Sequence, residues 1–319
     1  MRTRALLSHA AARLSGLLVC TVIAAGCGVF GPSTSERGGV KQAVLQIAYV
    51  GSDDSIYISE ADGSSPRHVT RQVSGLSTEQ GWSYRWPTYS PDGKRLAFAG
   101  YRAGPGQVGT AVLVASAGQA SATAVLESAE MATIYLYWSP NSRYLAALLQ
   151  RGSELVLYLF DANGAEQPRE LLVGQPLYWS WAPDGTTIAV HVGGEAGSGA
   201  DAWVGLLHLG PGDARQERFG DPPGAFRAPA WSPSGAKLAY AILGGGTSLL
   251  SVRDMAGQVT RIASSTSDVA FNWSPSGDWL ANGTSKYLPS VSCLTSPVPR
   301  SARASANPSA SAPDWARTR

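Results

Sequence analysis

The sequence predicts an all-β protein in which one short unit is repeated along the chain. Three observations support this fold class: a recurring turn, a strand with period-2 alternation after each turn, and a turn-rich composition of 36 Gly and 20 Pro. The prolines of the repeated turn stand 42–50 residues apart, at positions 91, 140, 183, 233 and 275. Periods of this length with strand composition are typical of a β-propeller, whose blades have four strands each.

Each copy of the turn has the same chemical plan. The copies are YSPDGKRLAF from residue 89, WSPNSRYLAA from 138, WAPDGTTIAV from 181, WSPSGAKLAY from 231 and WSPSGDWLAN from 273. The leading aromatic is suited to packing between neighbouring blades, the proline sets φ for a type I turn, and the glycine takes a positive φ. Ser142 replaces that glycine in the second copy, so we expect a slightly different turn there.

The strand that follows each turn predicts the number of blades. These second strands are expected at 94–99, 143–149, 186–192, 236–242 and 278–282, and 45–50 has the same alternation without a preceding turn. We therefore expect an additional first blade that has lost its innermost strand. Six blades are predicted, with seven as the alternative, and the last blade is expected to be incomplete.

The repeat also resembles a known family. Aromatic-Ser-Pro-Asp-Gly-x-x-(Ile/Leu)-Ala-aromatic, followed by a hairpin such as IYISEADG at 56–63, resembles the PD-type, WD40-like repeat of TolB-like six-bladed propellers over residues 42–282. The resemblance implies the fold but no particular activity, because one fold hosts many functions. The same repeat forms the propeller of prolyl-oligopeptidase-type enzymes, but no hydrolase domain is expected after it here.

The N-terminus predicts export. Residues 1–26 are expected to form a signal peptide. Its three arginines precede the apolar stretch 14–25, which is too short to span a bilayer comfortably. The sequence IAAGC at 23–27 resembles a bacterial lipobox, although that family favours Leu where Ala24 stands. The resemblance implies that Cys27 is lipidated and anchors the protein to the outer face of a cell membrane. An ordinary cleaved signal with an incidental cysteine is the alternative.

The remaining chain divides into three parts. Residues 27–41 have the composition of a flexible tether, 42–289 form the propeller, and 290–319 are rich in Ser, Ala, Pro and Arg. The last part has no strand alternation, so we expect a disordered tail. A shifted reading frame that truncates the last blade is a second interpretation of the same composition.

The candidate binding residues stand shortly before the blade aromatics in the sequence. Propellers bind ligands where the loops that enter the innermost strands converge, and three or four residues before the aromatic stand Arg85, Trp86, Tyr135, Tyr178 and Arg227. Aromatic faces with guanidinium groups suit a peptide terminus, a carboxylate or a sugar. Packing between blades is the alternative role for the aromatics.

The chemistry of the chain favours binding over catalysis. No metal or cofactor motif is present, and His68, His191 and His208 are expected to lie in strands rather than at a metal. The net charge of +2 without a basic run excludes a nucleic-acid footprint. We expect a monomeric envelope lipoprotein that recognises a protein or peptide partner. The alternative is a carbohydrate-active hydrolase or lyase whose acids stand in channel loops, such as Glu79, Glu130, Asp213, Asp221 and Asp268.

Overall fold

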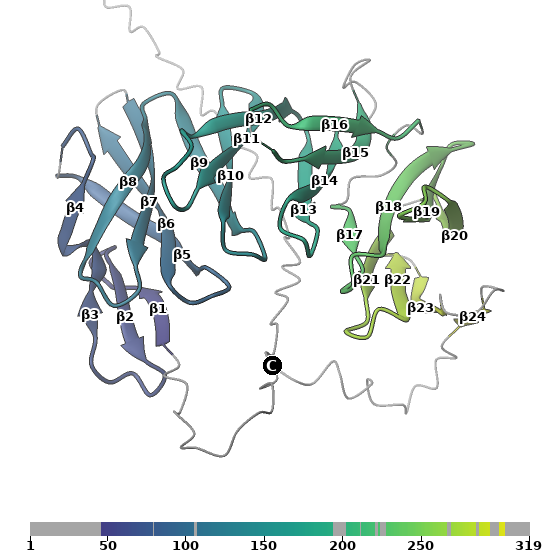
Figure 1. Cartoon of the computed structure of the whole chain (residues 1–319), viewed down its shortest axis with the longest axis horizontal. Helices are drawn as coiled ribbons and strands as arrows, with labels where there is room; N and C mark the ends of the chain where they lie inside the picture. The colour runs from purple at the N-terminus through teal and green to yellow at the C-terminus, as the bar shows by residue number, and fades with distance from the viewer. Residues whose placement is uncertain are drawn as a thin grey trace, which may run out of the picture. The chain divides into compact units, whose positions relative to one another are not determined.

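The computed structural model describes residues 46–303, apart from 79, 105–106, 194–201, 211, 221–222, 224–227, 267–268, 285–286 and 294–299. The described chain is almost entirely β-strand (Figure 1). Its strands form six sheets, in which each strand pairs antiparallel with the next strand along the chain. One additional short strand in the second sheet pairs in parallel. The expected all-β fold is confirmed, and the number of blades in the complete protein stays a prediction.

The sheets, which we name A to F in chain order, share one strand plan (Figure 1). The innermost strands belong to sheets B to F and are β5 (Trp82–Tyr89), β9 (Met131–Trp138), β13 (Leu177–Trp181), β17 (Ala230–Trp231) and β21 (Val269–Trp273). The second strands are β1 (Gln46–Val50), β6 (Arg95–Gly104), β10 (Tyr144–Arg151), β14 (Thr187–Val192), β18 (Lys237–Gly244) and β22 (Trp279–Thr284). Within the described residues sheet A consists of β1, β2 and β3, and the expectation that its blade lacks an innermost strand stays a prediction.

The third strands are β2 (Ile56–Glu60), β7 (Gln107–Ser116), β11 (Glu154–Asp161), β15 (Trp203–His208), β19 (Thr247–Asp254) and β23 (Tyr287–Cys293). The outer strands are β3 (Arg67–His68), β8 (Ser121–Ser128), β12 (Arg169–Gly174), β16 (Arg215–Arg218), β20 (Val259–Ser265) and β24 (Arg300–Arg303). A short 3₁₀ turn (Val69–Arg71) leads into β4 (Gln72–Ser74), which pairs in parallel with β8. This parallel pair extends sheet B to five strands.

Two strands of sheet F lie where the sequence shows no alternation. Most of β23 and all of β24 fall within the stretch 290–303, and they continue the antiparallel pairing of β22. Ladder hydrogen bonds are made by the main chain, so pairing does not require alternating side chains.

The five repeated turns have one geometry. In each turn the residue after the aromatic donates its N–H to the carbonyl five positions further on. Its own carbonyl accepts the N–H of the residue three positions further on, and both bonds measure 2.8–2.9 Å. The residue three positions on has a φ of 60–77° in all five copies. The expectation of a different turn at Ser142 is wrong, because Ser142 has a φ of 60° and the same bonds. Its Oγ accepts a hydrogen bond from the N–H of Asp92 at 3.0 Å. This bond offsets the cost of placing a residue other than glycine in the left-handed backbone conformation.

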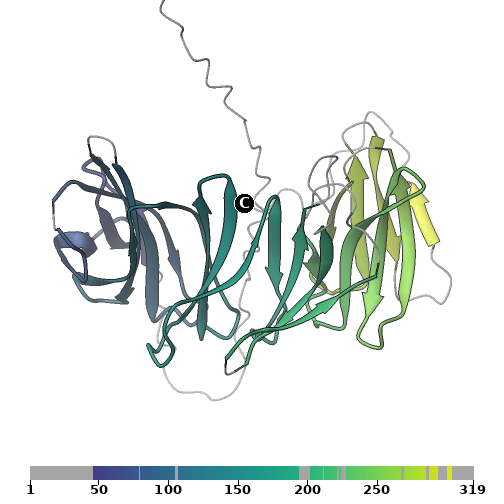
Figure 2. The ribbon, with the colours of Figure 1, turned by 90° about the horizontal axis from the view of Figure 1, so that it is seen from above.

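Apolar side chains pack between consecutive sheets rather than within one sheet. Five separate cores lie at the junctions A–B, B–C, C–D, D–E and E–F. The repeated tryptophans Trp138, Trp181, Trp231 and Trp273 all face the preceding sheet, as expected for blade aromatics. Consecutive sheets therefore lie side by side (Figure 2).

Three of these tryptophans also link the sheets by hydrogen bonds. The indole N–H donates to the backbone carbonyl of the residue just before the preceding sheet's aromatic: Trp138 to Thr88 at 3.0 Å, Trp181 to Tyr137 at 3.3 Å and Trp273 to Ala230 at 2.9 Å. The indole nitrogen of Trp231 is buried and has no hydrogen-bond partner among the described residues. The junction between sheets D and E thus lacks the link that three other junctions have.

Candidate functional site: exposed aromatic side chains on the inner strands

Trp86 stands on a bulge of the inner strand β5. Arg85 pairs with Ala99 of β6 and Thr88 pairs with Ala97, so Trp86 and Pro87 together oppose one residue. The φ of Trp86 is 55°, a strained value for a bulky residue, and its side chain is 50% exposed. Bulges re-aim side chains and are frequent beside functional sites, where local strain is also concentrated. The bulge therefore directs a large apolar ring outward at an energetic cost.

The next inner strand presents two further rings. Tyr135 and Tyr137 lie two residues apart on β9 and are each 45% exposed, whereas Leu136 and Trp138 between and beside them are buried. This alternation places both tyrosines on the face opposite to the one that packs on sheet B. Their rings contact one another at 6.1 Å between centroids. Tyr135 also meets the buried Trp179 of β13 edge-on at 5.7 Å.

Contacts join the two strands. Trp86 meets Tyr101 of β6 edge-on at 5.8 Å, and the Tyr101 hydroxyl donates a hydrogen bond to the carbonyl of Thr133 on β9. The strands β5 and β9 are also in direct contact. We name Trp86, Tyr135 and Tyr137 the aromatic surface. Each of its rings contacts another aromatic ring, and the neighbour of Tyr135 on β13, Trp179, is buried.

The hydroxyl groups of this surface lie in a partly desolvated setting. Burial raises the pKa of both Tyr135 and Tyr137 above the usual value for tyrosine. Both hydroxyls are therefore neutral donors and acceptors at physiological pH. They suit a ligand with peptide or hydroxyl groups.

Arg85 is engaged within the protein. Its Nη2 lies 2.9 Å from Oδ1 of Asp54, in the turn between β1 and β2, and its Nη1 donates to the carbonyl of Tyr84 at 2.8 Å. Both members of the ion pair are partly exposed, so a ligand carboxylate would compete with Asp54 for the guanidinium. The sequence analysis predicted Arg85 as a ligand-binding residue and missed this partner, 31 positions earlier in the chain.

The structure does not place the other predicted site residues in the aromatic surface. Tyr178 lies half-buried on β13, with its ring edge-on to His191 at 6.4 Å. Arg227 and Cys27 lie outside the described residues, as do three of the five candidate loop acids: Glu79, Asp221 and Asp268. Glu130 and Asp213 are exposed. The carboxylate layout that would favour a hydrolase or lyase is therefore not defined by the described part of the chain.

Sequence reasoning missed Tyr137. Only positions three and four before the blade aromatic were considered, whereas Tyr137 stands one before Trp138. The signal was present, since residues i and i+2 of a strand share a face and Tyr135 was already a candidate.

Titratable groups elsewhere serve structure. His208 and Glu217 of sheet D and Arg253 of sheet E form a cluster, with the Glu217 carboxylate 3.1 Å from His208 Nε2 and 2.9 Å from Arg253 Nη2. The His208 hydrogen bond, followed by the Arg253 contacts, lowers the pKa of Glu217 despite partial burial. No group of three metal-ligating side chains occurs in the described ranges. Within those same ranges no helix has the length and apolarity needed to cross a membrane.

Comparison with known proteins defines the fold class. No family model matches the chain, and no curated protein matches its sequence. Among solved structures, TolB from Acinetobacter baumannii has a TM-score of 0.42 and 17% identity, covering 75% of this chain and 56% of that one. Dipeptidyl peptidase 4 from Porphyromonas gingivalis has a TM-score of 0.56 and 12% identity, covering 77% and 42%.

An oligogalacturonate lyase in complex with manganese is similar as well, with a TM-score of 0.50, 12% identity, and coverage of 77% of this chain and 72% of that one. The chain spans about half the length of the first two structures. The series of mostly four-stranded antiparallel sheets and the likeness to the peptidase and the lyase define a β-propeller. At such low identities the likeness concerns the fold alone.

Proposed function

We propose that this protein is an envelope-anchored β-propeller that binds a protein or peptide partner and has no catalytic role. The observation that supports this function is the aromatic surface: three large rings, 45–50% exposed, on two consecutive inner strands, one of them held by a strained bulge. Exposed clusters of large apolar side chains mark interaction sites, and Trp and Tyr are the residues most enriched at binding hot spots.

The chemistry of the surface favours a peptide over a charged small molecule. Its rings offer apolar faces, its tyrosine hydroxyls are neutral, and the nearest cation, Arg85, is already paired with Asp54. Such a site suits an extended peptide whose apolar side chains pack on the rings while its backbone bonds to the hydroxyls.

Affinity capture from envelope extracts tests this function. Wild type is compared with Trp86→Ala/Tyr135→Ala and with Trp279→Ala, whose ring is 42% exposed on β22, outside the aromatic surface. The captured protein is then purified and its Kd measured with each variant. Loss of one hot-spot ring costs about 2 kcal/mol or more, roughly a 30-fold weaker Kd. Equal affinity of the double variant and the Trp279 variant would refute the proposal.

We further propose that the protein is lipidated at Cys27 and exposed as a monomer on the outer face of a membrane. The lipobox-like IAAGC and the tether after it support this localisation. Two acyl chains hold a protein stably, at about 0.8 kcal/mol for each buried CH₂. Radiolabelled palmitate incorporation should disappear in Cys27→Ser. Persistent labelling of that variant would contradict the anchor.

A carbohydrate-active hydrolase or lyase is the second candidate, supported by the similarity to the oligogalacturonate lyase. Incubation of the purified chain with oligogalacturonate, with and without Mn²⁺, tests it. Shortened or unsaturated products would favour this candidate over a pure binding role.

A further inference from the structure

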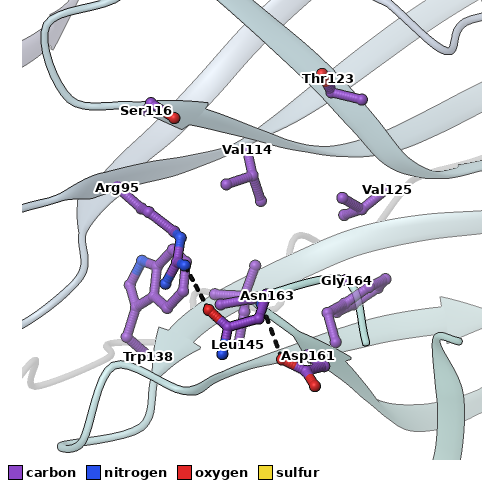
Figure 3. Close-up of a pocket in the computed structure, with 12 residues that line it drawn as sticks. Arg95, Val114, Ser116, Thr123, Val125, Trp138, Leu145, Asp161, Asn163 and Gly164 are labelled. Atoms are coloured by element: carbon purple, nitrogen blue, oxygen red, sulfur yellow. Dashed lines mark hydrogen bonds between the residues drawn. The ribbon is translucent and has the colours of Figure 1, made fainter. Parts of the chain in front are cut away.

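A cavity separate from the aromatic surface lies between sheets B and C (Figure 3). Its volume is about 280 Å³, and it is lined by residues of β6, β7, β8, β9, β10 and β11 and of the turn after β11. No residue of the aromatic surface lines it. Its lining includes Arg95 at the start of β6 and the residues 161–164 at the end of β11 and in the turn after it.

The walls of the cavity are apolar. Val114 and Val125 contribute from sheet B, and Trp138, Leu145 and Phe160 contribute from sheet C. The three residues of sheet C are almost fully buried, whereas both valines are partly exposed. A cavity about twice the ~150 Å³ that holds a benzene ring accommodates an amino-acid-sized molecule.

Arg95 provides a cation at the rim. Its Nη2 donates to Oδ1 of Asn163 at 2.7 Å, and its Nη1 lies 3.4 Å from the carbonyl of Ser142. Five other arginines of the described chain form ion pairs, but no described carboxylate lies within ion-pair distance of Arg95. Several of its five N–H donors are therefore available to a ligand.

Asp161 provides an anion on the same rim. Its Oδ1 accepts the N–H of Asn163 at 2.8 Å, and no cation in the described chain pairs with it. Asn163 thus contacts both charged side chains, which places them on one side of the apolar cavity (Figure 3). A simple carboxylate would be attracted by Arg95 and repelled by Asp161.

We propose that this cavity binds a free α-amino acid with an apolar side chain of the size of Leu or Phe. Arg95 bonds the α-carboxylate, Asp161 bonds the α-ammonium, and the side chain enters between the valines and the apolar side chains of sheet C. Only a zwitterion satisfies both charges of the rim. Because the ligand contacts two sheets, its binding stabilises the B–C junction.

Derivatives of one ligand test the recognition on the wild-type full chain. Isothermal titration and thermal unfolding are measured with L-phenylalanine, L-leucine, N-acetyl-L-phenylalanine and L-phenylalaninamide. The free amino acids should bind and raise the melting temperature with increasing concentration. Each derivative lacks one charge and should bind roughly tenfold or more weakly. Absence of binding by both free amino acids at millimolar concentrations, or equal binding of the derivatives, would overturn the proposal.

Variants locate the site. Arg95→Met and Asp161→Asn should each weaken L-phenylalanine binding roughly tenfold or more, because each removes one charged contact. Arg102→Met is the matched control on the same strand, since Arg102 lies over the Trp82 ring and does not line the cavity. Melting temperatures without ligand report whether each variant folds. Unchanged affinity in a folded Arg95→Met protein would place the amino acid elsewhere and contradict the assignment.

Discussion

The indole hydrogen bonds between sheets allow a controlled test of what holds the propeller together. Replacing Trp138 by Phe keeps an aromatic ring in the core but removes the N–H that donates to Thr88 at 3.0 Å. Replacing Trp231 by Phe also removes the five-membered part of an indole ring. The N–H of Trp231, however, is buried without a partner in the described chain. The two substitutions differ in whether a hydrogen bond is lost, and Trp138 is also more deeply buried than Trp231. The deeply buried Trp273 therefore provides a second comparison.

The expected difference follows from hydrogen-bond energetics. Trp138→Phe removes a bond worth about 1 kcal/mol net and takes one hydrogen-bond donor from the Thr88 carbonyl, with a total cost of about 1–3 kcal/mol. Trp231→Phe removes a buried donor that has no partner among the described residues, which offsets part of the lost packing. We expect Trp138→Phe to be less stable than Trp231→Phe by about 1–3 kcal/mol.

Equilibrium urea unfolding followed by far-ultraviolet circular dichroism measures both free energies without relying on tryptophan emission. Thermal unfolding should show a difference of roughly 2–4 °C for each kcal/mol. Trp273→Phe should behave like Trp138→Phe, because its N–H donates to Ala230 at 2.9 Å. Equal destabilisation by the three substitutions would refute the assignment of stability to these bonds.

Three further predictions concern the turns and a charge cluster. Ser142→Ala should cost about 1–2 kcal/mol more than Ser142→Gly in urea unfolding, because alanine keeps the strained φ of 60° and loses the bond to Asp92. Gly185→Ala should be more destabilising than Gly93→Ala, since both have a φ of 68° but only at 185 would a Cβ lie 2.4 Å from Asn141; equal melting temperatures would contradict this. The folded pKa of Glu217 is lowered, so its stabilising effect is present above the unfolded pKa of about 4.3 and is lost as pH falls through the folded pKa. Unfolding free energies from pH 3 to 7 should therefore fall less steeply on the acid side in Glu217→Gln, and an unchanged acid slope would contradict the assignment.

Local patterns predicted the strands because the relevant physics is local. The expected second strand 143–149 overlaps β10 (Tyr144–Arg151) in all but its first residue. The expected strand 186–192 likewise overlaps β14 (Thr187–Val192) in all but its first residue. Period-2 alternation and turn chemistry operate over about ten residues, so a single sequence contains them. The same locality explains the wrong expectation at Ser142. The compensating contact comes from Asp92, 50 positions away.

The candidate site was predicted only in part, because exposure depends on contacts between sheets. Trp86 and Tyr135 were identified from their position before the blade aromatic, but no local pattern indicates the bulge that aims Trp86 outward. The pairing of Arg85 with Asp54 joins two sheets and was equally invisible. The cavity beside Arg95 also arises from two sheets, and the sequence analysis did not identify it.

Site-specific photo-crosslinking tests the proposed binding role most directly. A photoreactive p-benzoylphenylalanine replaces Tyr137 of the aromatic surface, and in a control protein it replaces the exposed Trp279 of β22. After irradiation of the protein in its own envelope, the account predicts one defined protein adduct from position 137 and none of that adduct from position 279. The same adduct from both positions, or none from position 137, would contradict recognition through the aromatic surface.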